Sequence, residues 1–338
     1  MADYLKSTKK AYAVLFILAG IMVMVFVSLS CMPENYPVVL QPLAIGSSHN
    51  EADTLLYIAY KKGFFISNGL EVTIKSYTSG AAAVNGMLND EVDIATGSEY
   101  VIVQNVFKRQ VVNTIGVISK TYSVRLVGRI DLGIRSISDL EGKRIGVPLG
   151  TLGQFYLSRF LELKGMIDKP MTMVNIDVSQ SVDVLVNGDV DAVQTWEPYA
   201  SRIKEKLGDD AMVWSSQNEQ PQYKNVIVTD VWLSQYPDVM ERVLKALAEA
   251  ESFTTLHSDE AKTIIQEWLG YDDEYMALAW QTNEFPLFLN QALLLAMEDE
   301  ARWMIINKLT TEEQIPDFRG YIYVDGLKAV KPEAVNIR

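Results

Sequence analysis

Apolar and polar positions along this chain follow a pattern that occurs twice. Residues 88–95 (LNDEVDIA) and 186–193 (VNGDVDAV) each follow a short segment with helical apolar spacing, and each has an Asn/Gly/Asp turn before an apolar run. This order predicts a helix, a turn and a buried strand. Such turns are common after helices, so one copy alone would mean little. Two copies with similar flanks predict two similar α/β lobes.

The same pattern of periods predicts elements along the rest of the chain. Alternating or short apolar runs predict strands, and longer runs with a 3.6-residue period predict helices. The alternation of the two predicts mostly parallel sheets covered on both faces. Strands are expected at 42–48, 70–75, 92–95, 111–118, 124–130, 143–148, 172–177, 211–214 and 225–229, and helices at 52–65, 81–88, 99–107, 152–164, 233–256, 258–269, 272–281, 286–300 and 301–309.

Chain length and the positions of the predicted linker and turns indicate that the folded part has two lobes. The 338 residues suit about two domains. Residues 32–41 contain prolines and charge, and they predict a linker. We expect residues 42–130 and 223–338 to form the first lobe and residues 131–222 to form the second. The chain then crosses between the lobes twice, and these crossings form a hinge around a central cleft.

The first 31 residues indicate targeting. Three lysines precede an uninterrupted apolar run over residues 11–27, and the sequence SLSC ends at Cys31. This resembles a lipoprotein export signal. That signal has a leucine followed by a small residue at these two positions, whereas here Ser28 precedes Leu29. Two outcomes stay open: cleavage with lipid on Cys31, or an uncleaved hydrophobic helix that anchors the chain. Both predict a globular part tethered at the outer face of the cytoplasmic membrane, periplasmic or extracellular.

Composition excludes several classes of function. The net charge of −13 argues against nucleic-acid partners. One cysteine and two distant histidines argue against an intrachain disulfide and against a zinc site. No Cys–His or Ser–His pairing suggests a nucleophile, so we expect no catalytic residue and no enzyme. No phosphate-binding loop is present, so ATP hydrolysis belongs to another subunit. We expect no cofactor.

The order of several motifs resembles one known family. The motifs are AYKKGFF at 59–65, NGLEV at 68–72, VDIA at 92–95, DLEGKRIGV at 139–147, WEPY at 196–199 and VDGLKAVKP at 324–332. Together they resemble the ABC-transporter substrate-binding proteins for aliphatic sulfonates, nitrate, taurine and thiamine-pyrimidine precursors. The resemblance spans about residues 46–332. It implies a type II periplasmic-binding-protein fold, a small ligand in the cleft, and an ABC permease with its ATPase subunit as partners.

Helix starts supply the first candidate ligand contacts. Free N–H groups at a helix N-terminus attract anions, and glycine allows close approach. Each such residue can instead serve only as a helix cap. In the sulfonate-binding relatives the position of Thr151 lines the cleft, and the first strand end matches the first ligand loop of the family. The candidates are Gly150, Thr151, Ser79, Gly80, Gly97 and Ser98 at helix starts, with Ser47, Ser48 and Asn50 after the first strand.

Aromatic and acidic residues supply the second group of candidates. Trp196 follows the second repeated strand, where an indole can stack on a flat ligand or serve only as core. Glu197 either accepts from a ligand N–H or lies at a helix start that favours its charge. Glu51 and Asp53 either are exposed capping carboxylates or meet a cationic group, as a zwitterion such as taurine requires.

These expectations combine into one main function. The chain is expected to capture a small anionic or zwitterionic solute and to deliver it to a membrane permease. A pyrimidine-precursor-binding or synthase-like protein is one alternative, although the cysteine-rich run of such synthases is absent here. A ligand-sensing module that signals through a partner is another alternative.

Overall fold

The computed structural model describes residues 40–217 and 220–337. Residues 40–338 form one compact unit. The expected signal or anchor segment with Cys31, and nearly all of the expected linker, lie outside the described residues, so both stay predictions. Within the described part, no helix has both the length and the apolar character that crossing a membrane requires.

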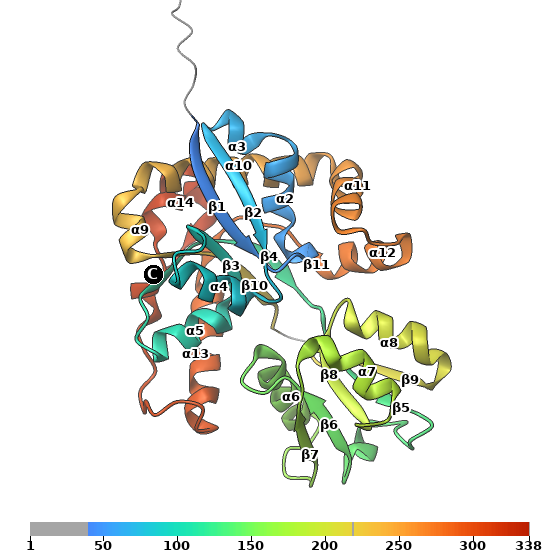
Figure 1. Ribbon diagram of the computed structural model, residues 1–338. Helices are drawn as coiled ribbons and strands as arrows, with labels where there is room; N and C mark the ends of the chain where they lie inside the picture. The colour runs from blue at the N-terminus through green and yellow to red at the C-terminus, as the bar shows by residue number, and fades with distance from the viewer. Residues whose placement is uncertain (1–39, 218–219, 338) are drawn as a thin grey trace, which may run out of the picture. The chain divides into compact units, whose positions relative to one another are not determined.

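A six-stranded sheet is the centre of what we call the first lobe, which includes the helices packed on this sheet (Figure 1). The strand order is β11-β4-β10-β3-β1-β2. β1 runs parallel to β2 and β3, whereas β10 runs antiparallel to both β3 and β4. The strands are β1 (Gln41–Ser47), β2 (Leu70–Ser76), β3 (Ile94–Ser98), β4 (Val112–Thr121), β10 (Gln222–Thr229) and β11 (Asn283–Glu284).

A five-stranded sheet with its helices forms what we call the second lobe. Its order is β7-β6-β8-β5-β9, with β6 parallel to β7 and β8 and with β5 antiparallel to β8 and β9. β5 was expected in the first lobe, but its pairing places it here. An apolar strand can pack in either sheet, so its sequence alone does not predict which strands it pairs with. The strands are β5 (Val124–Arg129), β6 (Arg144–Val147), β7 (Thr172–Asn175), β8 (Ala192–Trp196) and β9 (Ala211–Ser215).

Both sheets are mixed, so the expectation of mostly parallel sheets is wrong. Parallel neighbours need a crossover connection, which the β1–β3 and β6–β8 segments have. The chain instead passes directly from β4 in the first sheet to β5 in the second, and returns from β9 to β10. The sequence predicted two such crossings, the first after residue 130, whereas the first change of sheet lies between Thr121 and Val124. β12 (Leu289–Asn290) and β13 (Val335–Asn336) form a separate parallel pair.

The helices cover the sheets. The helices at Tyr199–Leu207 and Val324–Val330 were not expected, and expected helices differ in their bounds at three places. The 52–65 segment divides at Gly63, whose φ of +73° ends the helix. The 233–256 segment divides before Pro237, which begins a helix readily but cannot continue one. Residues 286–290 are not helical, and one helix covers 291–306. The helices are α2 (Thr54–Lys61), α3 (Phe64–Ser67), α4 (Gly80–Leu88), α5 (Glu99–Phe107), α6 (Leu152–Leu163), α7 (Ser181–Val186), α8 (Tyr199–Leu207), α9 (Asp230–Gln235), α10 (Pro237–Leu256), α11 (Ser258–Leu269), α12 (Asp273–Thr282), α13 (Gln291–Ile306) and α14 (Val324–Val330).

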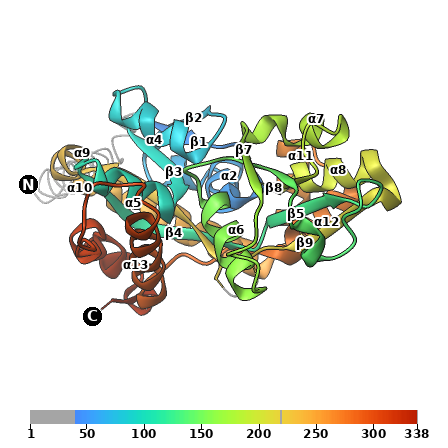
Figure 2. The same ribbon diagram turned by 90° about the horizontal axis from the view of Figure 1, so that it is seen from below.

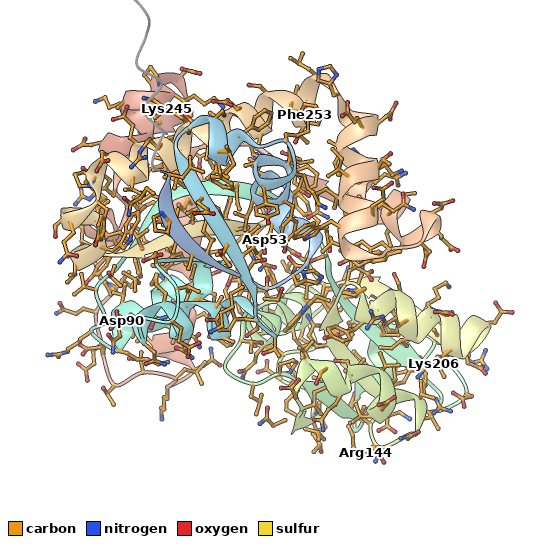
Figure 3. All side chains as sticks on the ribbon, turned by 45° about the horizontal axis from the view of Figure 1, so that its top comes forward. Asp53, Asp90, Arg144, Lys206, Lys245 and Phe253 are labelled. Atoms are coloured by element: carbon orange, nitrogen blue, oxygen red, sulfur yellow. The ribbon has the colours of Figure 1, made fainter. Side chains whose placement is uncertain are left out.

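Helix α6 joins the hydrophobic cores of the two lobes. Its Phe155 and Tyr156 pack into the core of the first lobe, where the Phe155 ring centroid lies 5.6 Å from that of Trp303. Trp303 belongs to α13, which packs beside α5 (Figure 2). The rest of the second lobe has hydrophobic clusters of its own on each side of its sheet. Among the described residues, the buried charged side chains are those of Glu51, Asp53, Glu99, Glu197, Lys224 and Glu300. Asp53 is labelled in Figure 3.

Candidate ligand-binding site

A cavity of about 360 Å³ lies between the strand ends of the two sheets. Both lobes line it: the first through the loop after β1 and the starts of α4 and α5, the second through the start of α6 and the end of β8. Strand ends facing each other across two sheets are where ligands bind in open α/β folds. Its size suits a small organic solute.

Three helix N-termini face this cavity from both lobes. Ser79 caps α4 by accepting a hydrogen bond from Ala82 N at 3.1 Å. Thr151 caps α6, accepting from Gly153 N at 3.2 Å and donating to Pro148 O at 2.6 Å. Ser98 is the N-cap residue of α5, but its side chain makes no capping hydrogen bond. These residues line the cavity, so the first-turn N–H groups offer positive partial charge to an anion.

The glycines among the candidates have different positions. Gly80 lines the cavity. A Cβ at Gly80 would lie 2.9 Å from Gly97 Cα, so the backbones of α4 and β3 pack too closely for any side chain. Gly97 therefore supports this wall from behind rather than lining the cavity. Gly150 also does not line it, but its carbonyl accepts a hydrogen bond from Gln104 Nε2 at 2.6 Å. This bond joins α5 of the first lobe to the second lobe.

The loop after β1 holds a buried ion pair. Ser48 and Asn50 line the cavity. Ser47 does not line it, and its hydroxyl donates a hydrogen bond to Asp53 Oδ2 at 2.8 Å. Lys224 from β10 donates to Ser48 Oγ at 2.6 Å and lies 3.2 Å from Asp53 Oδ2. Asp53 is fully buried and makes no capping bond, so the exposed-cap reading of this residue is wrong. The ion pair places an ammonium group at the cavity wall.

Glu51 is also buried, contrary to the exposed-cap reading. It lines the cavity, and its carboxyl oxygens accept hydrogen bonds from Tyr271 at 3.1 Å and Tyr275 at 3.2 Å. Burial raises the pKa of Glu51, and the charge of Glu197 adds a smaller rise. The loop after β1 thus brings an acid whose protonation a bound charge can change.

Trp196 and Glu197 both line the cavity from the second lobe. The Trp196 ring packs against the start of α6, where a Cβ on Gly153 would lie 3.4 Å from it. Glu197 is buried and accepts from Ser201 N at 3.0 Å and from Ser201 Oγ at 2.8 Å. Its other oxygen lies 3.7 Å from Arg125 Nε. Trp196 therefore offers a ring face or edge, whereas Glu197 already has protein partners.

Sequence comparison places this site in a known family. The model of the family described as NMT1/THI5 like matches residues 50–261. The chain belongs to this family. The matched stretch contains Asn50 and Glu51, all three helix starts, Trp196 and Lys224, whereas Ser48 lies just before it.

Individual relatives of this NMT1/THI5-like chain include named binding proteins. A Brucella abortus protein named "Putative binding protein" is 25% identical over 221 residues, which cover 64% of this chain and 67% of that protein. A Bacillus subtilis protein named "Putative aliphatic sulfonates-binding protein" is 26% identical over 221 residues, covering 63% and 65%. The alkanesulfonate-binding protein SsuA from Xanthomonas axonopodis pv. citri, solved with MOPS, gives a TM-score of 0.72 at 14% identity, covering 84% and 98%. This last likeness shows that the mixed α/β fold is shared.

Sequence reasoning missed several residues that line the cavity of this NMT1/THI5-like chain. Lys224 was missed although a lysine inside the apolar strand QYKNVIVT is a signal in itself. Gln104 lies in a helix interior and Arg202 is a surface residue of a helix, so neither had a local signal. The missed lining residues used below are Lys224, Arg202, Gln104, Tyr199 and Tyr271.

Proposed function

We propose that this chain is the extracytoplasmic solute-binding component of an ABC importer. It captures a small anionic or zwitterionic solute, such as a sulfonate, taurine or nitrate, and delivers it to a membrane permease driven by an ATPase subunit. The observation that carries this proposal is the convergence of the α4, α5 and α6 N-termini, from two lobes, on one cavity. Membership of a family with named binding proteins supports it.

Positively charged side chains in the cavity wall favour an anionic group on the solute. Lys224 lies at the wall beside the start of α5, and Arg202 lines the cavity from α8. Amide N–H groups and a buried ammonium both stabilise a sulfonate or carboxylate that has left water. The name of the Bacillus subtilis relative agrees with a sulfonate.

The two acids in the cavity wall favour a cationic group on the same solute. Glu51 and Glu197 both line the cavity and are close enough for their charges to interact. An ammonium group between them would offset that repulsion and would ionise Glu51. A zwitterion whose two charges lie a few bonds apart, such as taurine, satisfies the acids and the helix N-termini together.

A flat heteroaromatic solute is the second candidate. Trp196, Tyr199 and Tyr271 all line the cavity, and aromatic side chains of this kind stack on planar rings. A pyrimidine precursor of thiamine would use these rings and would donate its amino hydrogens to Glu51 or Glu197. We propose binding rather than catalysis for either solute.

Capture requires the lobes to close around the solute, and two hydrogen bonds already link the lobes and the crossings in this structure. The Gln104–Gly150 hydrogen bond joins the lobes at the cavity rim. At the crossings, Gln217 Nε2 donates to Thr121 O at 2.7 Å, so one crossing is tied to the other. We propose that these crossings are the hinge and that the N-terminal 31 residues tether the protein to the membrane, through lipid on Cys31 or through the hydrophobic segment itself.

A matched set of three solutes tests the proposal. The purified full-length protein in detergent is titrated calorimetrically with taurine, with ethanesulfonate, which lacks the amine, and with ethylamine, which lacks the sulfonate. We expect affinity to decrease in that order, because taurine offers both an anionic and a cationic group, whereas each of the other two solutes offers one. An aminomethylpyrimidine serves as the test of the second candidate. Binding of ethylamine alone, with none for either sulfonate or the pyrimidine, would refute the proposal.

A further inference from the structure

The cavity between the two lobes, which we call the first cavity, is larger than taurine requires. Its volume is about 360 Å³, the space of about twelve water molecules at about 30 Å³ each. Taurine joins its two charged groups by a two-carbon chain and displaces only part of that water. The remaining space is filled by water or by a further part of the solute, and the side chains around it indicate which.

Aromatic side chains from both lobes line the first cavity. The second lobe supplies Trp196 and Tyr199, and the first lobe supplies Tyr271. The position of Tyr271 is fixed, because its hydroxyl donates to Glu51 at 3.1 Å. Burial raises the pKa of Tyr271, and the charge of Arg202 on α8 partly offsets this rise. Tyr271 therefore lies near the start of α8, so the aromatic residues of the two lobes meet across the cavity.

Trp196 lies beside one of the three helix N-termini that attract an anion. It packs directly against the start of α6, where a Cβ on Gly153 would lie 3.4 Å from the indole carbon Cζ3. Thr151 is the N-cap residue of this helix, and it lines the cavity together with Gly153 and Trp196. The atoms attached directly to an anionic group at this helix start therefore lie next to the indole ring.

Two planar side chains in this part of the wall have no polar partner in the protein. Trp196 is half-buried at the end of β8, and within the described residues its Nε1 makes no hydrogen bond. The Arg202 side chain makes no ion pair or hydrogen bond in the same part of the chain, and its guanidinium lies 5.8 Å from the Tyr199 ring. An indole and a guanidinium both pack well on a flat ring.

We propose that the solute of the first cavity carries its anionic group directly on a planar aromatic ring, and that Trp196 selects for this ring. This inference rests on the proposed function and narrows it, because the charged solute and the flat solute become one molecule. An aminoaryl sulfonate or carboxylate has an anion for the helix N-termini, an amine for the acids and a ring for the indole. A saturated ring would bury similar area but would lack the attraction between ring quadrupoles.

Calorimetric titration with 4-(aminomethyl)benzenesulfonate tests this inference. The saturated equivalent is 4-(aminomethyl)cyclohexanesulfonate, and taurine is the equivalent without a ring. The full-length protein in detergent is used. We expect the aromatic solute to bind about three- to tenfold more tightly than the saturated one. Taurine should bind more weakly than either, because it buries less apolar area. Equal affinities for the aromatic and the saturated solute would overturn the inference.

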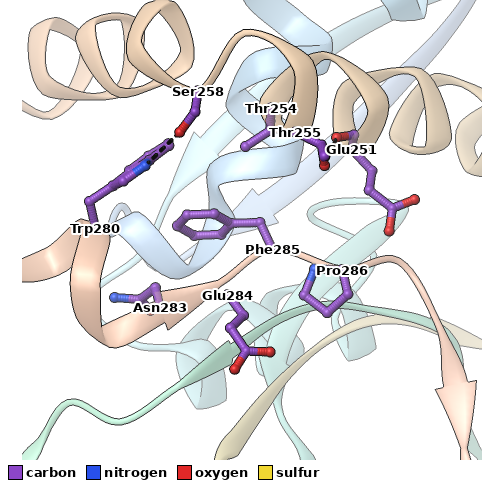
Figure 4. A pocket seen from close by; sticks show the side chains of 9 residues that line it. All are labelled: Glu251, Thr254, Thr255, Ser258, Trp280, Asn283, Glu284, Phe285 and Pro286. Carbon is purple, nitrogen blue, oxygen red and sulfur yellow. Dashed lines mark hydrogen bonds between the residues drawn. The ribbon is translucent and has the colours of Figure 1, made fainter.

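Variants of Trp196 show whether this residue causes the preference. Trp196→Leu should bind the aromatic and the saturated solute with equal affinity, whereas Trp196→Phe keeps a ring and should keep a preference of about twofold or more. Trp280→Leu is the matched control, because Trp280 lines a second cavity at the surface of the first lobe (Figure 4). This control should keep the wild-type preference. A Trp196→Leu variant that also kept it would overturn the role of Trp196.

Failure of this inference can be told apart from failure of the proposed function. If taurine or ethanesulfonate binds, but the aromatic solute binds no more tightly than its saturated equivalent, the ring is overturned and the proposed function stands. If no sulfonate binds saturably, the inference is overturned as well, and the titration with the aminomethylpyrimidine then decides the proposed function.

Discussion

Two carboxyl groups buried together in the first lobe should make stability fall as pH rises. Glu99 begins α5 and Glu300 lies in α13, and both side chains are fully buried. Glu99 Oε2 accepts from Tyr223 N at 2.9 Å. Burial raises the pKa of Glu99 to about 8. Burial, followed by the charge of Glu99, raises the pKa of Glu300 as well.

The size of the effect follows from the pKa of Glu99 in the two states. In the unfolded chain this carboxyl loses its proton near its ordinary pKa of 4.5, whereas the folded protein holds the proton until about pH 8. Between these values the folded state binds more protons, so the free energy of unfolding decreases as pH rises. At about 1.4 kcal/mol per pH unit, the loss reaches about 5 kcal/mol as an upper bound and then levels off.

Urea denaturation of residues 40–338 between pH 5 and pH 9, followed by tryptophan fluorescence, measures this dependence. Glu300→Gln keeps the shape of the side chain but has no proton to lose, so the variant lacks one of the two carboxyl groups whose pKa burial raises. We expect this variant to be more stable than the wild type above pH 7, by about 1–3 kcal/mol, with a shallower slope. Glu298→Gln on the same helix is the matched control and should follow the wild type.

Two results would refute this reasoning. A wild-type free energy of unfolding that stays constant between pH 5 and pH 8 would mean that the pair does not hold its protons. A Glu300→Gln variant with the wild-type slope would mean that other groups cause the dependence. Since α5 begins beside the first cavity and α13 carries the ring that receives α6, the same titration should also weaken the packing between the lobes at high pH.

Three further predictions concern the first cavity. Lys224→Met should lower the free energy of unfolding by about 3–5 kcal/mol, because it leaves a buried aspartate unpaired; Lys245→Met, at an exposed ion pair, should cost under about 0.5 kcal/mol, and equal losses in urea denaturation would contradict this. Gly80→Ala should cost about 1–3 kcal/mol in thermal melting because its Cβ would meet backbone at 2.9 Å, whereas Gly320→Ala, with open space around it, should not. Taurine affinity should rise with pH in the wild type as Glu51, whose pKa burial raises, ionises; in Glu51→Gln, calorimetry should find it independent of pH.

Local patterns in the sequence determined which segments are helices and strands. The helices predicted at 99–107 and 258–269 match α5 and α11, because their apolar period and their polar ends depend only on neighbouring residues. Ser79 and Thr151 cap their helices as expected, since an N-cap bond spans two or three residues. The sequence also indicated two sheets and two crossings.

Contacts between distant segments decided the rest. Lys224 meets Ser48 across 176 positions of sequence, and no local pattern can report such a meeting. Glu51 and Asp53 looked like exposed caps because their burial depends on α12 and β10, which follow more than a hundred residues later. The sequence likewise could not predict which strand pairs with β5, because the backbone hydrogen-bonding groups at a strand edge are the same whichever strand lies beside it. A surface cavity lined by residues of α10, α11, α12 and β11 likewise exists only because tertiary packing brings these elements together (Figure 4).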